Sequence, residues 1–197
     1  MSPRQPQSVH QLKVTLLETT PPIWRRLQVA STINLRRLHD VIQATMGWMQ
    51  SHLYEFRVDG VEYGEPSSEY DLPSARRAKS TQLRQVTPEP GTTLHYLYDF
   101  GDGWKHEVLV EAVLLPEPRV SYPRCIGGER ACPPEDVGGI GGYEEFLTVI
   151  GNPRHREYQD LMAWSGGHFD PEAFDLAAIN AALAHLGPSP WERSPWG

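Results

Sequence analysis

Alternation of apolar and polar residues predicts two β-strands near the start of the chain, over residues 10–18 and 23–30. The intervening Thr-Thr-Pro-Pro is typical of a turn, so we expect these strands to form a hairpin. The apolar members of the alternation are Leu12, Val14, Leu16, Ile23, Leu27 and Val29.

After residue 30 the spacing of the apolar residues changes to that of an amphipathic helix. Asn34 is suited to the N-cap of this helix, and Gly47 is suited to its C-terminal end. The apolar residues at helical spacing are Leu35, Leu38, Ile42 and Met46. Residues 52–64 predict a strand, an Asp-Gly turn at 59–60 and a short return strand.

Two further strands are predicted over residues 93–100 and 104–113, on either side of the turn in the segment YDFGDGWKHEV (98–108). The preceding residues 65–92 are rich in Ser, Pro and Glu and show little periodicity, so we expect a long surface loop there.

After Pro116 the chain is rich in Gly and Pro, and helical patterns follow at 143–152, 156–166 and 170–187. In the last of these, Asp170 fits an N-cap and is followed by a proline at the first helical position. Strands precede helices instead of alternating with them. The pattern therefore predicts an α+β fold with a mostly antiparallel sheet built from hairpins, one helix after the first hairpin, and a C-terminal helical segment packed on the sheet.

The length of 197 residues fits one domain, which we place at 9–187, with flexible tails at 1–8 and 188–197. No apolar run reaches the roughly 20 residues of a membrane helix, and the first residues lack the apolar core of a signal peptide. We therefore expect a cytoplasmic protein that does not bind membranes.

The segment YDFGDGWKHEV brings candidate catalytic groups onto one hairpin. A two-residue turn at Asp102–Gly103 places Asp99 opposite His106 and on the same face as Trp104. A carboxylate beside an imidazole orients the ring and raises its pKa, which suits acid–base chemistry. The alternative is purely structural, because Asp-Gly is a common hairpin turn and Trp104 is the kind of side chain that fills cores.

The segment CPPEDVGG is the second candidate region. Two prolines stiffen the approach to Glu135 and Asp136, which with Trp104 are the candidate ligand-binding residues. With His168, the residues Asp99, His106 and Asp136 form the candidate catalytic set. Equally, the two acidic residues could cap the following helix.

Cys125 and Cys132 are too few for a disulfide framework and lack the usual spacing of zinc ligands. They are, with His106, the candidate metal ligands, and zinc is the ion they would take. Two ordinary reduced cysteines are the simpler interpretation, and the sequence requires no cofactor.

A net charge of −7 argues against a general nucleic-acid binder, which needs surplus Lys and Arg to neutralise phosphates. The charge is uneven, since residues 1–60 carry seven Lys or Arg against four Asp or Glu. This predicts either ordinary solvated surface or a basic docking patch, whose members would be Arg25, Arg26, Arg36 and Arg37.

Five ordered segments together resemble the plasmid pRiA4b ORF-3-like family, whose members carry labels such as insertion-element passenger or resolvase-like. They are PPIWRRLQV, LRRLHDVIQATMGWMQSHLYEF, YDFGDGWKHEV, CIGGERACPPEDVGGIGGYEEFL and FDPEAFDLAAIN. The resemblance spans residues 9–186 and implies a compact α+β fold without an established activity. The family's motif positions fall on Asp99, Gly101, Asp102, Trp104, His106, Cys125, Pro133, Pro134, Glu135, Asp136, Gly138 and Gly139.

Three functions remain open at this point. They differ in whether the protein is an enzyme, and the sequence does not decide this. The first is a binding or adaptor module that holds a protein or small-molecule partner near Trp104 and Asp136. The second is a metal-assisted or acid–base hydrolase that uses the candidate catalytic set, and the third is a nucleic-acid-associated protein of a mobile element. The hydrolase requires that Asp99, His106, Asp136 and His168 converge on one centre.

Overall fold

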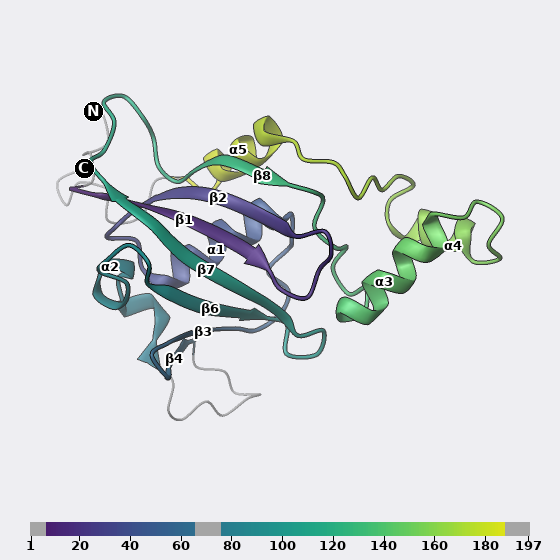
Figure 1. Ribbon diagram of the computed structural model, residues 1–197, viewed down its shortest axis with the longest axis horizontal. Helices are drawn as coiled ribbons and strands as arrows, with labels where there is room; N and C mark the ends of the chain where they lie inside the picture. Colours follow the sequence, from purple (N-terminus) through teal and green to yellow (C-terminus); the bar gives the residue numbers. More distant parts are fainter. Residues whose placement is uncertain (1–6, 66–75, 188–197) are drawn as a thin grey trace.

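The computed structural model describes residues 7–65 and 76–187, which form an eight-stranded sheet with helices beside it (Figure 1). The predicted tails, apart from residues 7 and 8, and residues 66–75 of the predicted loop lie outside the described residues. The strand order is β5-β4-β3-β6-β7-β1-β2-β8, and every pair of neighbours is antiparallel except the short pair β4–β5. The predicted α+β class with a mostly antiparallel sheet is confirmed.

The strands are β1 (Val9–Leu16), β2 (Ile23–Ala30), β3 (Tyr54–Val58), β4 (Val61–Gly64), β5 (Arg76–Arg77), β6 (Thr93–Tyr98), β7 (Trp104–Leu114) and β8 (Arg124–Glu129). The helices are α1 (Leu35–Met46), the 3-10 helix η1 (Ala78–Ser80), α2 (Leu83–Val86), α3 (Gly139–Ile150), α4 (Tyr158–Trp164) and α5 (Leu176–His185). No helix in these described ranges is both long enough and apolar enough to span a membrane.

The first hairpin and helix α1 form where the pattern predicts them. β1 pairs with β2 in register from Val9 opposite Ala30 to Leu16 opposite Ile23. The side chain of Asn34 accepts a hydrogen bond from the Arg37 amide at 2.8 Å, which is the N-cap. Gly47 ends α1 in the left-handed conformation that glycine adopts without a steric cost.

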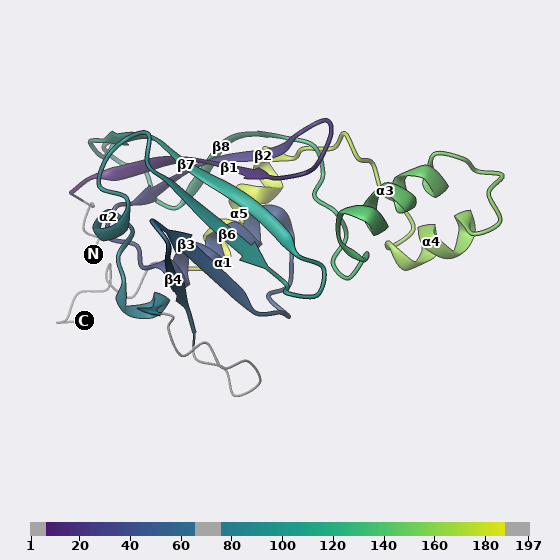
Figure 2. The ribbon, with the colours of Figure 1, turned by 60° about the horizontal axis from the view of Figure 1, so that its bottom comes forward.

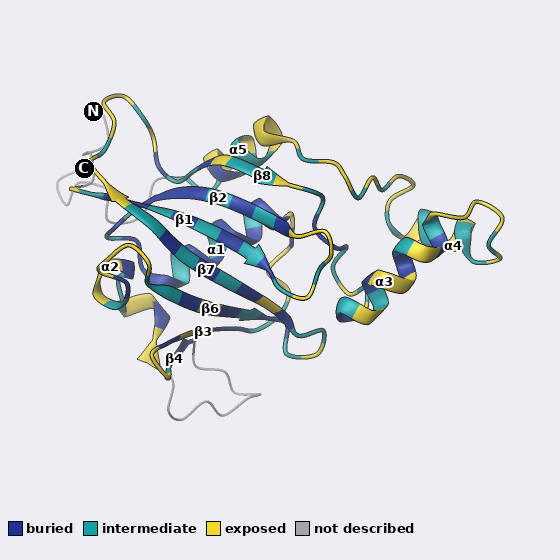
Figure 3. Cartoon of the chain, viewed as in Figure 1, coloured by how far each residue is buried: buried dark blue, intermediate teal, exposed yellow. Residues whose placement is uncertain are grey.

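One face of the sheet packs on α1 and α5, and the core lies between them (Figure 2). Figure 3 shows the burial that results along β1, β2, β6 and β7. On the opposite face, polar side chains of neighbouring strands bind one another. Arg26 donates to Glu111 at 2.7 and 2.8 Å, Gln11 donates to the same carboxylate at 3.0 Å, and Gln28 donates to Gln11 at 3.2 Å. The polar side chains of this cluster therefore satisfy one another across three neighbouring strands.

Strand β8 lies at one edge of the sheet and was not among the predicted strands. Its residues come from the Gly-rich stretch that the sequence pattern marks as irregular. The Asn180 side chain of α5 accepts from the Cys125 amide and donates to the Cys125 carbonyl, both at 2.9 Å. Because an amide side chain here takes the place of a further strand, α5 covers part of an edge that would otherwise be open.

Two predictions about elements are wrong in their bounds. Within the predicted loop 65–92, residues 76–86 form β5, η1 and α2, since Ala78 and Leu83 are fully buried and tie this segment to the core. The last helix begins at Leu176 with Asp175 as its N-cap, not at Asp170. The preceding segment is instead held beside β8, where the Pro171 carbonyl accepts from the Ala131 amide at 3.1 Å.

Helices α3 and α4 project beyond one end of the sheet (Figures 1 and 2). A small aromatic cluster holds them together, in which Phe146 makes edge contacts with Trp164 and Phe169 at ring-centroid distances of 6.1 and 5.1 Å. Both helices were predicted, and α3 begins four residues before the predicted start at 143.

Candidate metal centre

The hairpin between β6 and β7 closes with a five-residue loop, not with the two-residue turn predicted at Asp102–Gly103. Tyr98 pairs with Trp104 and Tyr96 pairs with His106, so Asp99 lies in the loop. The predicted pairing of Asp99 with His106 is therefore wrong. The loop is longer because Asp99 itself organises it: its Oδ1 accepts from the amides of Gly101 at 2.8 Å and Asp102 at 3.3 Å.

This turn leaves the second carboxylate oxygen of Asp99 facing another part of the chain. Asp99 adopts a left-handed backbone conformation with φ of 56°, and its side chain is only 10% exposed. Its Oδ2 lies 3.6 Å from Nε2 of His52, which follows α1 in the connection to β3. The hairpin loop thus presents a fixed and largely buried carboxylate oxygen.

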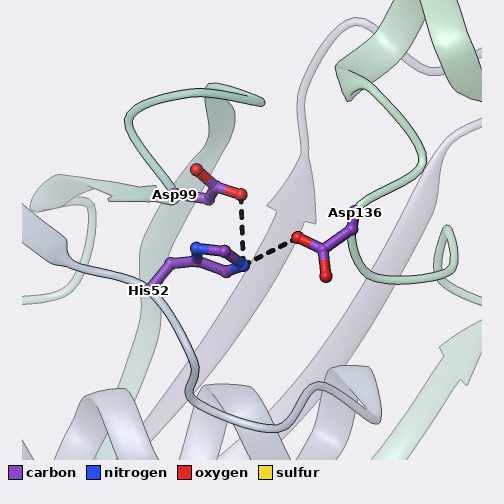
Figure 4. A group of neighbouring side chains, drawn as sticks. All are labelled: His52, Asp99 and Asp136. Carbon is purple, nitrogen blue, oxygen red and sulfur yellow. Dashed lines mark hydrogen bonds and ion pairs between the residues drawn. The ribbon is translucent and has the colours of Figure 1, made fainter.

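Asp136 completes a cluster of three side chains from three separate connections (Figure 4). Its Oδ1 lies 2.8 Å from His52 Nε2, and its side chain is 64% exposed. Within the described residues, His52, Asp99 and Asp136 are the one group of three His, Cys, Asp or Glu residues whose possible ligand atoms all lie within 4.8 Å of one another. Zinc binds its ligand atoms at about 2.1 Å, so two ligand atoms of the same ion lie at most about 4.2 Å apart. The possible ligand atoms of this cluster lie within 4.8 Å of one another, so small side-chain adjustments would bring all three within reach of one ion.

Neighbouring contacts hold the three connections together. The Tyr98 hydroxyl donates to Glu135 Oε1, and the Met49 amide donates to Glu135 Oε2 at 2.8 Å. Burial and this carboxylate raise the pKa of Tyr98, so its hydroxyl stays protonated. Trp48 donates from Nε1 to the Pro133 carbonyl at 3.0 Å and stacks on Tyr98 at 5.2 Å. Glu135 is therefore engaged in fastening the segment and not presented to solvent as a free ligand.

Arg25 anchors the segment that leads to Asp136. Its side chain is buried in β2, and all five of its N–H groups donate at distances of 2.8–3.2 Å. The acceptors are the backbone carbonyls of Trp24, Thr45, Glu129 and Arg130 and the sulfur of Cys132. One guanidinium thereby joins the end of α1, strand β2 and the chain that leaves β8.

The structure brings Asp99 and Asp136 together but places His106 elsewhere. His106 is fully buried in the core, where its Nδ1 lies 3.1 Å from the Trp104 carbonyl and it packs edge-on against Trp48. Burial lowers the pKa of His106 to about 4, so the ring is neutral. Trp104 is also fully buried and has no surface to offer a ligand, and His168 is exposed in the connection between α4 and α5.

The two cysteines do not form a metal site with His106 among the described residues. Both are buried and unbridged. Cys132 Sγ lies 3.2 Å from the Arg25 guanidinium and 3.0 Å from Met46 Sδ, and Cys125 Sγ lies 3.3 Å from the Gly127 carbonyl. Burial raises the pKa of both thiols, to about 11 for Cys132, which disfavours the thiolate that metals bind.

The four arginines of the predicted basic patch do not share one free face. Arg25 is buried, and Arg26 is paired with Glu111 on the opposite face from α1. Arg36 pairs with Asp40 at 2.8 Å, and Arg37 donates to the carbonyls of residues 186 and 187, both at 2.6 Å. These contacts give no support to a nucleic-acid interface.

The sequence pattern did not single out His52, although the residue belongs to the cluster. It stands at the predicted start of a strand, where a lone histidine carries no spacing signal. One signal was present, since His52 lies within one of the five segments that resemble the family, at residues 35–56. Only the tertiary structure places this loop beside the hairpin and the segment CPPEDVGG.

Replacing Gly139 by alanine is expected to destabilise the protein by about 2–3 kcal/mol. Gly139 has φ of 68°, and a Cβ there would lie 2.5 Å from the carbonyl oxygen of Asp102, so α3 and the hairpin loop would have to separate. Urea unfolding measures the effect. Gly141→Ala is the matched control: a Cβ there meets no atom within 4 Å, and alanine favours the helix, so it should be neutral or stabilising. Equal effects of the two substitutions would contradict the close approach of α3 to the loop.

The fold and the cluster define an α+β domain with a His-Asp-Asp group at one end of its sheet. Residues 8–178 match the family described as plasmid pRiA4b ORF-3-like protein, and the chain belongs to that family. The predicted resemblance is thus confirmed.

Two similar proteins illustrate the family. The chain is 38% identical over 187 residues to the uncharacterised protein y4hQ of Sinorhizobium fredii, an alignment that covers 94% of this chain and 95% of that one. It is also similar to the crystal structure of MM3350, a protein of unknown function from Methanosarcina mazei Go1, at 37% identity and a TM-score of 0.78, covering 87% of this chain and 97% of that one.

Proposed function

We propose that this protein is a binding module whose ligand is a divalent metal ion held by His52, Asp99 and Asp136. The observation that carries the proposal is the convergence of one imidazole nitrogen and two carboxylate oxygens, from three separate connections, within 4.8 Å. An adaptor surface built on Trp104 receives no support, because that side chain is buried.

The environment of the cluster favours a cation. One of its carboxylates is largely buried and is oriented by the hairpin amides, so binding an ion costs little further ordering of Asp99. The cluster holds two carboxylates against one imidazole, so its net charge is negative and attracts a cation. Its donors are nitrogen and oxygen without sulfur, which suits zinc, cobalt or manganese and disfavours soft ions such as copper(I).

The test is metal binding by the purified full chain after treatment with a chelator. Isothermal titration with zinc or manganese should show one ion per chain, and an ion present at 100 times its dissociation constant should stabilise the protein by about 2.7 kcal/mol. His52→Gln, Asp99→Asn and Asp136→Asn should each weaken binding about 100-fold or more, since each removes one of three ligands.

Asp102→Asn is the matched control for these variants. Asp102 is in the same hairpin loop and accepts from the Gly138 amide, but it does not belong to the cluster. It should change metal affinity no more than severalfold. Absence of stoichiometric binding, or equal losses for Asp102→Asn and Asp136→Asn, would refute the proposal.

A metal-assisted hydrolase is the second candidate, and the openness of the cluster favours it. Three protein ligands leave coordination positions for water, as in catalytic rather than structural zinc sites. The side chains of His52 and Asp136 are 31% and 64% exposed, so solvent reaches the group. Hydrolysis of activated phosphate and carboxylate esters by the zinc- or manganese-loaded chain, lost in Asp136→Asn, distinguishes this candidate from a module that only binds.

A further inference from the structure

A chain of hydrogen bonds joins two serines and a histidine at the open end of the β1–β2 hairpin. The Ser8 hydroxyl donates to Ser31 Oγ at 2.8 Å, and Ser31 Oγ lies 2.7 Å from His10 Nδ1. His10 Nε2 lies 2.8 Å from the backbone carbonyl of Thr87, which follows α2. None of these residues belongs to the candidate metal centre, so this is a separate feature of the fold.

The pairing of β1 with β2 explains why these side chains meet. The antiparallel register continues past the ends of the two strands, where the Ser31 amide donates to the Ser8 carbonyl at 3.0 Å. Side chains two residues apart on a strand point to the same side, which places His10 beside the two serines. Helix α2 is tied to the same place, because the Arg84 amide donates to the Ser31 carbonyl at 3.1 Å.

The Thr87 carbonyl fixes the direction in which the two hydroxyls donate. A carbonyl oxygen only accepts, so the hydrogen of the neutral imidazole is on Nε2 and Nδ1 of His10 is an acceptor. Ser31 therefore donates to Nδ1, and its oxygen accepts from Ser8. Burial lowers the pKa of His10, which keeps the ring neutral and able to take a proton. Both hydroxyls thus donate in the same direction, from Ser8 toward the imidazole.

The Ser8 end of this chain of hydrogen bonds is the part that meets solvent. Ser31 and His10 are each 1% exposed, whereas Ser8 is partly exposed. A purely structural role needs only Ser31 to satisfy Nδ1 of the buried ring, but here a second serine extends the chain to the surface. A serine hydroxyl becomes a nucleophile when a base can take its proton, and Ser8 has that connection through Ser31.

We propose that Ser8 is an activated nucleophile that takes up the acyl group of an activated ester. Ser8 Oγ attacks the acyl carbon while its proton passes to Ser31 Oγ, and the proton of Ser31 passes to His10 Nδ1. The bond between the acyl carbon and the leaving oxygen breaks, and the leaving group departs with its electron pair and takes up a proton by way of Ser31. The products are an ester at Ser8 and a free alcohol, with no change in oxidation state. The Thr87 carbonyl stabilises the charge that the ring carries in between.

The experiment is acetylation of the full chain by p-nitrophenyl acetate, stopped with acid and mapped by mass spectrometry of its peptides. Ser8 should gain an acetyl group about 100-fold faster than Ser80, since assistance by a general base contributes roughly 10²–10⁴-fold. Ser80 is the internal control, because it is exposed and its hydroxyl donates to a backbone carbonyl instead of a base. In the urea-unfolded chain the two serines should react at equal rates.

Two variants test the path of the proton. Ser31→Ala leaves Ser8 in place but removes the hydroxyl between it and the imidazole, and His10→Gln keeps an amide donor for Thr87 but no acceptor at Nδ1. Each should slow acetylation of Ser8 about 100-fold, with urea unfolding showing that the variant is folded. If neither variant folds, the folded and urea-unfolded wild-type chains still decide. Equal rates at Ser8 and Ser80 in the folded chain, or an unchanged rate at Ser8 in either folded variant, would overturn the proposal.

Discussion

Replacing Arg25 by alanine is expected to destabilise the protein by about 4–5 kcal/mol, or to prevent folding altogether. The guanidinium donates five hydrogen bonds, four of them to backbone carbonyls. Removing it leaves buried carbonyls without donors, each at a cost of about 1–3 kcal/mol, although the individual costs do not add fully.

Arg26→Ala is the matched control, one residue along the same strand. Arg26 points to the other face of the sheet, where its side chain is 33% exposed and paired with Glu111 at 2.7 Å. Losing a half-exposed ion pair should cost about 1 kcal/mol. Urea unfolding of the two variants measures the difference, and equal losses would mean that Arg25 does not anchor the chain as its contacts indicate.

The free energy of unfolding is expected to fall by several kcal/mol between pH 7 and pH 4. The reason is that two buried histidines bind a proton in the unfolded chain over this range but not in the folded protein. Burial lowers the pKa of His106 to about 4 and of His39 to about 3, from an unfolded value of 6.5. Both side chains are therefore neutral in the fold but protonated in the unfolded chain over this range. The stability that they contribute is complete above about pH 6.5 and is lost as the pH falls toward the folded values, at about 1.4 kcal/mol per unit for each residue.

Replacing both histidines isolates this effect from other titrating groups. Burial also raises the pKa of Asp40 and Glu55, an effect of opposite sign that contributes to the total. A double variant, His39→Asn with His106→Asn, should therefore show a shallower decline in the free energy of unfolding between pH 7 and pH 4.5, whatever its absolute stability.

The same replacement at His95, which is exposed on β6, should leave the slope unchanged. Urea unfolding at a series of pH values measures each slope. An unchanged slope in the double variant would show that His39 and His106 do not govern the response to acid.

His106 also shows that a strand can be predicted correctly while the direction of its side chains is predicted wrongly. The strands on both sides of the hairpin were predicted within two residues of their ends, yet the side-chain pairing across them was not. A two-residue turn and a five-residue loop differ by an odd number of residues, and a change of one residue in register moves a strand's side chains to the other face. His106 and Trp104 accordingly face the core, and Asp99 leaves the sheet to join another cluster.

The periodicity of the sequence was enough to predict the fold class and the elements with strong patterns, although it missed β5, η1, α2 and β8. Helix α1 was predictable with both of its ends, since Asn34 and Gly47 act on the backbone next to them. The alternation in β1 and β2 was equally informative, because each strand has one face in the core.

The candidate site, in contrast, could be recognised only after the chain was folded. His52, Asp99 and Asp136 come from connections that carry no periodicity, and they meet because the sheet order places the β6–β7 loop beside the end of α1, while Arg25 and Trp48 draw in the segment after β8. Local propensity acts over a few residues, whereas convergence of distant connections depends on packing across the whole sheet. The residue types of CPPEDVGG and YDFGDGWKHEV indicated Asp136 and Asp99. The third member, His52, could be recognised only from the folded structure, which places it beside both carboxylates.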